Sequence, residues 1–166
     1  MDKEKEKLTR LFSNLKMVRD QFIECLNDKN LPVIIYTHLD ADGLSSGAIL
    51  GKALYRKNIP FQITVLRQLE KREIAQISKK VQDYNNFLIF SDFGSGQYLE
   101  LQQKLIQKEN FNSFLILDHH IPQNVSNVED FSLIKEIHEK TKHWHVNPYF
   151  FGVDGSCEIS SAGLCY

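Results

Sequence analysis

The sequence lacks paired cysteines and long hydrophobic runs. Its three cysteines, Cys25, Cys157 and Cys165, form no C-x-x-C pair and no even set, which argues against a disulfide framework and favours reduced thiols in a cytosolic protein. No apolar run approaches the ~20 residues of a membrane span. The charged residues 2–7 are not followed by an apolar signal core. We therefore expect a cytoplasmic protein that makes no use of a membrane.

An excess of charge of either sign is also absent. The 20 basic residues nearly balance the 21 acidic ones, for a net charge of −1. This balance does not indicate a strong free-standing nucleic-acid binder, but it does not exclude one, because a metal site neutralises its own acids locally. With 166 residues, of which 42% are hydrophobic, the chain is expected to form one domain with a core of its own.

Two ligand-binding motifs are incomplete. The Gly94-Ser95-Gly96 turn lacks the third glycine of a dinucleotide fingerprint, because Leu99 stands in its place. The acidic run that begins at Asp40 lacks the acid at the fifth position and the glutamate at the twelfth position of an EF-hand loop. We therefore expect neither a dinucleotide site nor an EF-hand.

Helical and strand patterns alternate along the chain. Apolar residues at spacings of three and four predict helices over residues 3–29, 43–57, 71–83 and 97–108. Short apolar runs predict strands at 33–37, 61–66, 87–91 and 114–118, and a shorter one at 143–147. Residues 123–142 are hard to assign, with 131–138 as either helix or edge strand, and a last helix is expected from Glu158 onward. This alternation predicts an α/β fold, with a mostly parallel sheet and helices on both faces.

Acids and imidazoles stand where three of the predicted strands end. His38, Asp40 and Asp42 follow the first strand, Asp92 follows the third, and residues 118–120 follow the fourth. The carboxyl ends of parallel strands meet at one edge of a sheet, and ligands bind there. One such group would be a weak signal, but three groups at the same edge predict a functional site.

Each group taken alone has a simpler explanation. Asp42 could cap the helix that Gly43 opens. His119 and His120 could be a strand-end pair in which one ring packs and the other is solvated. These simpler explanations become less favoured only because all three groups are expected at the same edge of the sheet.

The residue types at this edge favour a particular kind of metal centre. They are rich in oxygen, include imidazole and contain no thiolate, which favours Mn²⁺ or a similar divalent ion over structural zinc. The candidate ligands are His38, Asp40, Asp42, Asp92 and His119. Five ligands exceed the usual share of one ion in an open catalytic site, so we expect two ions with Asp92 shared between them. Such centres commonly cleave phosphate esters by in-line attack of water.

These motifs resemble those of a known family. Asp118-His119-His120 is the signature that names the DHH phosphoesterases, His38-Leu39-Asp40-Ala41-Asp42-Gly43 resembles their first motif, and Asp92 resembles their second. Within the family the sequence is most similar to the RecJ-like nucleases of the archaeal type, in which a stretch similar to residues 147–156 follows the DHH motif. The resemblance covers roughly residues 33–166.

The resemblance implies a role for each motif residue. The five candidate ligands named above would bind two Mn²⁺ ions, with Mg²⁺ as an alternative. His120 would contact the scissile phosphate, and Asp118 would orient the histidines. These two residues are the candidate catalytic residues.

Further substrate contacts are less specific. Arg67 and Gln68, at the end of the second predicted strand, are candidate phosphate contacts or simply a solvated strand end. Asp154 and Ser156 lie in a turn with Gly152 and Gly155 and are also candidate substrate contacts. Asp154 is in addition the one contender for a missing metal ligand, against a role in forming the turn.

The resemblance also implies how the chain is organised. Residues 1–30 would be an N-terminal helix, and residues 31–166 would be a DHH catalytic domain without its C-terminal portion. The family's fourth metal motif and its DHH-associated second domain would both come after Tyr166. We therefore expect a truncated or split enzyme that is nearly inactive alone and that works with the missing half, for instance as a separate chain.

The function implied is that of a metal-dependent exonuclease acting on single-stranded DNA or RNA in DNA repair or replication, with the replication complex GINS as a candidate partner. One alternative is a small-molecule DHH phosphodiesterase that hydrolyses oligoribonucleotides or cyclic dinucleotides. Such relatives usually place the first histidine four residues before the first aspartate, whereas His38 and Asp40 are two apart. Another alternative is a non-catalytic replisome component, against which the intact ligands argue.

Overall fold

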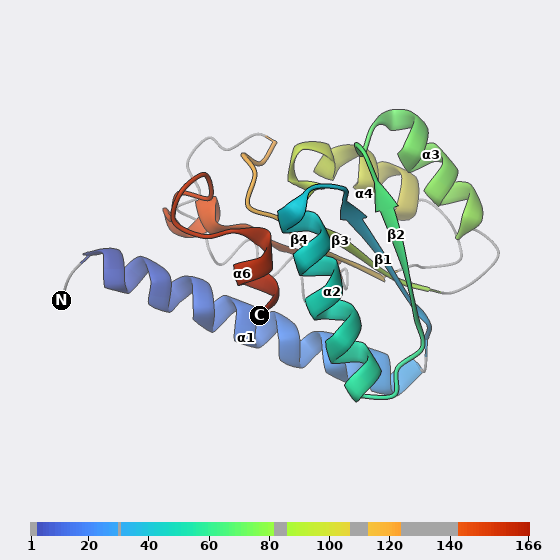
Figure 1. Ribbon diagram of the computed structural model, residues 1–166, viewed down its shortest axis with the longest axis horizontal. Helices are drawn as coiled ribbons and strands as arrows, with labels where there is room; N and C mark the ends of the chain where they lie inside the picture. The colour runs from blue at the N-terminus through green and yellow to red at the C-terminus, as the bar shows by residue number, and fades with distance from the viewer. Residues whose placement is uncertain (1–2, 30, 82–85, 107–112, 124–142) are drawn as a thin grey trace.

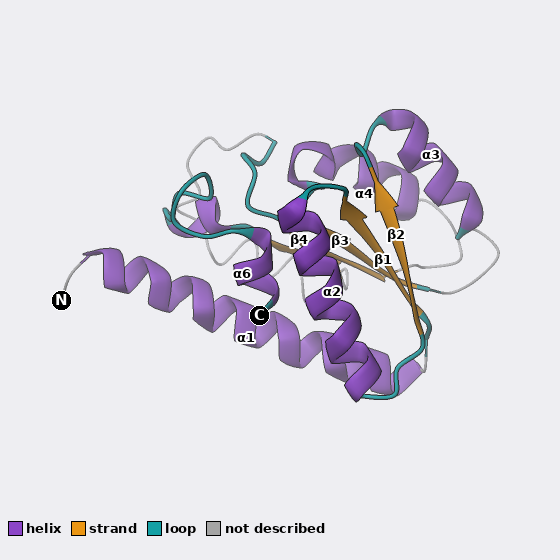
Figure 2. Ribbon diagram, in the orientation of Figure 1, coloured by secondary structure: helices purple, strands orange, loops and turns teal. Residues whose placement is uncertain are grey.

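The computed structural model describes residues 3–29, 31–81, 86–106, 113–123 and 143–166. The strands are β1 (Val33–His38), β2 (Phe61–Leu66), β3 (Phe87–Ser91), β4 (Ser113–Leu117) and β5 (His143–Val146). The helices are α1 (Lys3–Lys29), α2 (Ala41–Arg56), α3 (Lys71–Lys80), α4 (Tyr98–Ile106) and α6 (Ser161–Cys165), with short 3-10 turns η1 (Ser95–Gln97) and η2 (Pro148–Phe151). Figures 1 and 2 show these elements.

The five strands form one sheet in the order β2-β1-β3-β4-β5, and every neighbouring pair is parallel. This confirms the predicted parallel α/β fold. Because all strands run in the same direction, their carboxyl ends lie at one edge of the sheet. Crossovers through helices connect parallel strands, which explains the alternation in the sequence.

Helices cover both faces of the sheet. Helices α1, α2 and α6 lie on one face, and α3 and α4 lie on the other (Figure 1). The central strand β3 is buried along its whole length, and its side chains alternate between the two layers: Phe87 and Ile89 pack with the first layer, Leu88 and Phe90 with the second. A continuous apolar run, rather than an alternating one, is typical of strands buried on both faces.

Strand β2 forms one edge of the sheet and is the most exposed strand. The side chains of Phe61, Ile63 and Val65 face α2 and are still 36–47% exposed. Close packing of α2 over this edge depends on Gly51, since a Cβ there would crowd Ile63 and Phe61. The predicted boundaries of β2 agree with the structure.

Helix α1 packs along the sheet as its predicted amphipathic pattern requires. Leu11 and Val18 are buried, and Phe22 packs edge-on against Phe87 of β3. The indole nitrogen of Trp144 in β5 donates a hydrogen bond to the side-chain oxygen of Gln21. The N-terminal helix is therefore part of the same core as the sheet.

Two helices begin at positions other than the predicted ones. Helix α2 begins at Ala41, two residues early, because Asp40 is its N-cap and accepts a hydrogen bond from the nitrogen of Gly43 at 2.9 Å. Helix α6 begins at Ser161 instead of near Glu158, because Ser160 is its N-cap and Glu158 still belongs to a turn closed on Asp154.

Some predicted features fall on residues that are not described. The ends of the predicted helices beyond residues 81 and 106, and the segment at 131–138, lie outside the described residues. None of the described helices combines the length and the apolar character that a membrane crossing requires.

Replacing Ile89 with alanine should lower the free energy of unfolding by about 2–5 kcal/mol, because Ile89 is fully buried in the central strand and its loss leaves a cavity. The matched change Ile63→Ala, on the exposed edge strand, should cost less than half as much. Denaturant unfolding followed by circular dichroism measures both. Equal losses would contradict this account of the core.

Candidate metal centre

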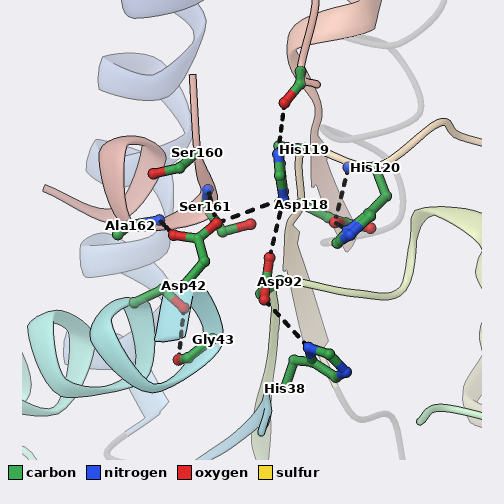
Figure 3. A network of polar contacts seen from close by, with 12 residues as sticks. His38, Asp42, Gly43, Asp92, Asp118, His119, His120, Ser160, Ser161 and Ala162 are labelled. Atoms are coloured by element: carbon green, nitrogen blue, oxygen red, sulfur yellow. Dashed lines mark hydrogen bonds and ion pairs between the residues drawn. The ribbon is translucent and has the colours of Figure 1, made fainter. Parts of the chain in front are cut away.

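The site lies where β1, β3 and β4 end (Figure 3). His38 is the last residue of β1, Asp92 directly follows β3, and residues 118–120 directly follow β4. The register of the three strands places Ser91, the last residue of β3, between Thr37 of β1 and Leu117, the last residue of β4. The three motifs therefore lie together at one edge of the sheet, as the sequence predicted.

Asp92 lies at the centre of the cluster. It is 1% exposed, and neither carboxylate oxygen has a hydrogen-bond partner within the described part of the chain. One oxygen lies 3.3 Å from Nε2 of His119, and the other lies 3.7 Å from Nδ1 of His38. A buried carboxylate without donors is costly unless a cation joins it.

The backbone of Asp92 is left-handed, with a φ of 67°. Aspartate adopts this conformation more readily than most residues, but it remains uncommon and often marks a functional position. The conformation is held by a 2.9 Å hydrogen bond from the nitrogen of Asp92 to the carbonyl of Leu117. Neighbouring strand β4 therefore fixes the direction of the Asp92 side chain.

Burial raises the pKa of Asp92 to about 6. The nearby Ser161 side chain acts to lower it, and the nearby carboxylates of Asp40 and Asp42 act to raise it further. The three acids repel one another when all are ionised. A cation between them would remove this repulsion.

His119 has a defined tautomer. Its Nδ1 lies 2.6 Å from the carbonyl oxygen of Gly155, which can only accept, so Nδ1 carries a proton. Its Nε2 faces Asp92 at 3.3 Å and Asp42 at 3.5 Å. A neutral His119 therefore presents a lone pair toward two carboxylates, an arrangement typical of metal ligands held by an outer hydrogen bond.

His38 and Asp40 form the other side of the cluster. Nδ1 of His38 lies 2.9 Å from one oxygen of Asp40, whose other oxygen caps α2. Burial raises the pKa of Asp40, but the backbone of Gly43 and the side chains of Asp92 and His38 outweigh it, so the pKa is lowered on balance. Asp40 is thus the readily ionised acid beside Asp92.

Two groups of potential ligands share Asp92. Among the described residues, the ligand atoms of His38, Asp40 and Asp92 lie within 4.8 Å of one another, as do those of Asp92, His119 and His120. This sharing is the geometry that a carboxylate bridging two ions would need. The ligand set predicted from the sequence contained Asp42 and assigned His120 to the phosphate instead, and which of the two binds an ion stays a prediction.

Asp42 has a role that the sequence did not reveal. Its two oxygens accept hydrogen bonds from the backbone nitrogens of Ser161 and Ala162, at 2.7 and 2.8 Å (Figure 3). Asp42 thus caps α6, about 120 residues away, and the alternative that it caps its own helix is wrong because Asp40 does so. A carboxylate has about four acceptor positions, so these two bonds leave room for a cation.

Asp118 and His120 form a hydrogen-bonded pair. Asp118 is fully buried, and one of its oxygens accepts hydrogen bonds from Nδ1 and the backbone nitrogen of His120, at 2.8 and 3.1 Å. Burial raises the pKa of Asp118, but these bonds and one from the nitrogen of Ser95 outweigh it and lower the pKa. The hydrogen bond to Asp118 in turn raises the pKa of His120, whose side chain is 55% exposed.

The four candidate substrate contacts lie outside both ligand groups. Arg67 and Gln68 are exposed and directly follow β2, beside the end of β1. The carboxylate of Asp154 accepts hydrogen bonds from the nitrogen and hydroxyl of Ser156 and from the hydroxyl of Tyr149, at 2.7–2.8 Å. These bonds, from Ser156 first, lower the pKa of Asp154 to about 2. Asp154 and Ser156 together form the turn before α6.

Backbone groups complete the site, and most of them leave no mark in a sequence. They are the carbonyl of Gly155 and the nitrogens of Ser95, Ser161 and Ala162. Only the glycines could have indicated these close backbone contacts from the sequence. A Cβ on Gly155 would collide with the carbonyl oxygen of His119, and a Cβ on Gly43 would collide with the carbonyl oxygen of His38.

The comparisons with known proteins find a relative in sequence and several in fold. No protein-family model matches the chain. Over 132 residues, 80% of this chain, it is 42% identical to an uncharacterized protein of Methanocaldococcus jannaschii, of which the match covers 27%. The chain thus spans about a quarter of the length of that curated relative.

Among solved structures, the fold is similar to that of the exonuclease RecJ bound to manganese, with a TM-score of 0.64 and 19% identity over 92% of this chain and 35% of RecJ. It is similar to the DHH domain of a member of the s1p family of ribosomal proteins, with a TM-score of 0.61 and 16% identity over 99% of this chain and 39% of the other. The chain has the DHH fold.

The fold is also similar to that of CDC45 from Entamoeba histolytica, with a TM-score of 0.57 and 14% identity over 81% of this chain and 25% of CDC45. At these identities the likeness concerns the fold. The His and Asp side chains at the edge of the sheet therefore have to carry any argument about chemistry.

Replacing Asp92 with asparagine should stabilise the metal-free protein at alkaline pH. The pKa of Asp92 rises from 3.8 to about 6 on folding, so its proton contributes stability that is complete below about pH 4 and is lost as the pH rises through 6. An asparagine side chain does not ionise and has no such loss. Asp92→Asn should therefore be more stable than wild type by up to about 3 kcal/mol above pH 7, and nearly equal to it at pH 4.

Thermal or denaturant unfolding between pH 4 and 8, in the presence of a chelator, measures this difference. The exposed Asp20 on α1 provides the control, since Asp20→Asn should follow the wild-type pH dependence. A wild type as stable as Asp92→Asn at pH 8 would mean that the buried acid is already compensated without a cation.

Proposed function

We propose that this chain is the catalytic part of a metal-dependent phosphodiesterase, an exonuclease that hydrolyses single-stranded nucleic acid with two Mn²⁺ ions. The observation that carries the proposal is the buried carboxylate of Asp92, which has no hydrogen-bond donor among the described residues and is shared by two groups of potential ligands. The likeness in fold to a RecJ exonuclease bound to manganese supports the same interpretation.

The residues at the site fit hard or borderline divalent ions. His38, Asp40 and Asp92 would hold one ion, and Asp92 and His119 would hold the other together with Asp42 or His120. Carboxylate and imidazole donors without thiolate suit Mn²⁺, with Mg²⁺ as the alternative. The bound ions would supply an activated water and would neutralise charge on the phosphate oxygens.

Two hydrogen bonds within the chain prepare this site. The carbonyl of Gly155 keeps the proton of His119 on Nδ1, so that Nε2 is available as a ligand. Asp118 keeps Nδ1 of His120 protonated, and the His120 side chain remains 55% exposed. A protonated His120 can then donate to a phosphate oxygen, which favours a substrate that carries negative charge.

A single strand is the proposed substrate because the DHH fold in RecJ-like nucleases faces a second domain, and a narrow cleft between two domains admits one strand. Arg67 and Gln68, at the same edge as the ligands, are proposed phosphate contacts, and Asp154 and Ser156 are proposed to act as turn residues around Gly155, whose carbonyl contacts His119. A role in DNA repair or replication, with a GINS-type complex as partner, follows from the resemblance to archaeal RecJ-like nucleases.

A non-catalytic role is the competing proposal, since the CDC45 structure has the same fold. The intact ligand groups favour catalysis, because a chain without a metal centre has no use for a buried, unpartnered acid such as Asp92.

Replacing Asp92 with alanine should weaken Mn²⁺ binding at least about tenfold, because the one shared carboxylate is lost. The matched change Asp154→Ala should leave the affinity within about twofold, because Asp154 is engaged in its own turn. Isothermal titration calorimetry with MnCl₂ measures both variants. The same affinity for wild type and Asp92→Ala would refute a bridging role for Asp92.

Residues 1–166 alone should hydrolyse a labelled single-stranded oligonucleotide only slowly, because the resemblance implies a further metal ligand and a second domain. Turnover should rise by more than about tenfold when a downstream region is supplied in cis or in trans, and blunt duplex should be a poor substrate. Asp92→Ala is the control for metal-dependent cleavage. Robust cleavage by the isolated chain would mean that its ligand set is already sufficient, and equal rates on duplex and single strand would reject the proposed substrate.

A further inference from the structure

A buried polar chain outside the metal ligands holds the turn that carries His119 and His120. It starts at Asn147, which follows β5 and is fully buried. The side-chain nitrogen of Asn147 donates hydrogen bonds to the carbonyl oxygen of His120 at 2.8 Å and to the hydroxyl of Ser95 at 2.9 Å. The edge strand β5 thus reaches the site without supplying a ligand.

The orientation of the Asn147 amide is determined by its partners. Its oxygen accepts a hydrogen bond from the nitrogen of Tyr149 at 3.0 Å and so caps η2. Its nitrogen therefore faces the carbonyl of His120, which can only accept. Both ends of the amide are in use, and neither could be reversed without leaving a buried group unpaired.

Ser95 links this contact to Asp118. Ser95 is fully buried in the turn after β3, and its backbone nitrogen donates to the second oxygen of Asp118 at 2.9 Å. Its hydroxyl, which accepts from Asn147, also lies 2.8 Å from Nε2 of His145 in β5. Ser95 and Asn147 therefore hold the turn at 118–120 through the Asp118 carboxylate and the His120 carbonyl, in addition to the contact of His119 with Gly155.

Little else holds His120 in place. Its side chain is 55% exposed, and the next residue, Ile121, is 73% exposed. Nδ1 of His120 is hydrogen-bonded to Asp118. The direction of Nε2 therefore depends on the orientation of the His120–Asp118 pair relative to the backbone of the turn. Fixing the backbone carbonyl of His120 fixes that relation.

We propose that Asn147, acting with Ser95, is a positioning residue for His120: it holds the backbone of the DHH turn so that the His120–Asp118 pair keeps one orientation toward the site. The part that concerns turnover rests on the proposed phosphodiesterase function. The structural part does not depend on any activity.

The structural test uses the metal-free 166-residue chain labelled with ¹⁵N. The Nδ1 proton of His120, bonded to Asp118, is identified as the imidazole signal that His120→Gln removes. Its exchange with water should accelerate at least about tenfold in Asn147→Ala and about threefold in Ser95→Ala, because the turn loosens in both. Unchanged exchange in a folded Asn147→Ala protein overturns the proposal.

Matched controls separate positioning from a general loss of buried polar contacts. Asn14 is a buried asparagine on α1, and Ser78 is a buried serine on α3 whose hydroxyl bonds the carbonyl of Lys104. Asn14→Ala and Ser78→Ala should leave the exchange of the His120 proton within about twofold. Acceleration in the controls equal to that in Asn147→Ala and Ser95→Ala overturns the proposal. If Asn147→Ala does not fold, Ser95→Ala decides, and unchanged exchange there overturns it as well.

The kinetic test uses the form of the enzyme that cleaves single strands. Asn147→Ala should lower kcat about 10–100-fold while KM and Mn²⁺ affinity stay within about threefold, because the ligands are untouched. An unchanged kcat with weaker Mn²⁺ binding would show that Asn147 supports the metal and not His120, and would overturn the proposal. If no form cleaves nucleic acid, the proposed function fails, and the exchange measurement still decides the positioning role.

Discussion

The buried carboxylate of Asp92 is the constraint on which the rest of the site depends. It stands between His38 and His119 with no donor of its own among the described residues, and burial raises its pKa to about 6. A protein tolerates such a group where a cation or a proton compensates it. The left-handed backbone at Asp92 and its hydrogen bond to Leu117 show that the chain is folded to keep the carboxylate there.

The parallel sheet supplies the precision that this centre needs. Strands in a sheet lie about 4.8 Å apart, so residues that directly follow neighbouring strands arrive at nearly ligand-to-ligand distance without long loops. Close approaches at the edge depend on glycine: Gly43 and Gly155 have no room for a Cβ beside the carbonyls of His38 and His119. The site is therefore built at the ends of regular strands, and its backbone segments approach one another closely at Gly43 and Gly155.

The C-terminal stretch closes the site from the other side. Asp42 caps α6, and the turn before α6 places the carbonyl of Gly155 against His119. Residues far apart in the chain are thus joined by backbone hydrogen bonds around the candidate metal site. This explains how a chain with nearly balanced charge gathers several acids at one place.

The sequence by itself determined the fold class, all five strand positions to within a residue, and the set of side chains that meet at the edge of the sheet. Continuous apolar runs indicate strands that are buried on both faces of the sheet. In a parallel sheet the residues at the ends of such strands lie together at one edge. Only the tertiary structure decided the partners of these side chains. Asp40 rather than Asp42 caps α2, and Asn147 holds His120, because hydrogen bonds between distant segments depend on the path of the backbone, which no local pattern records.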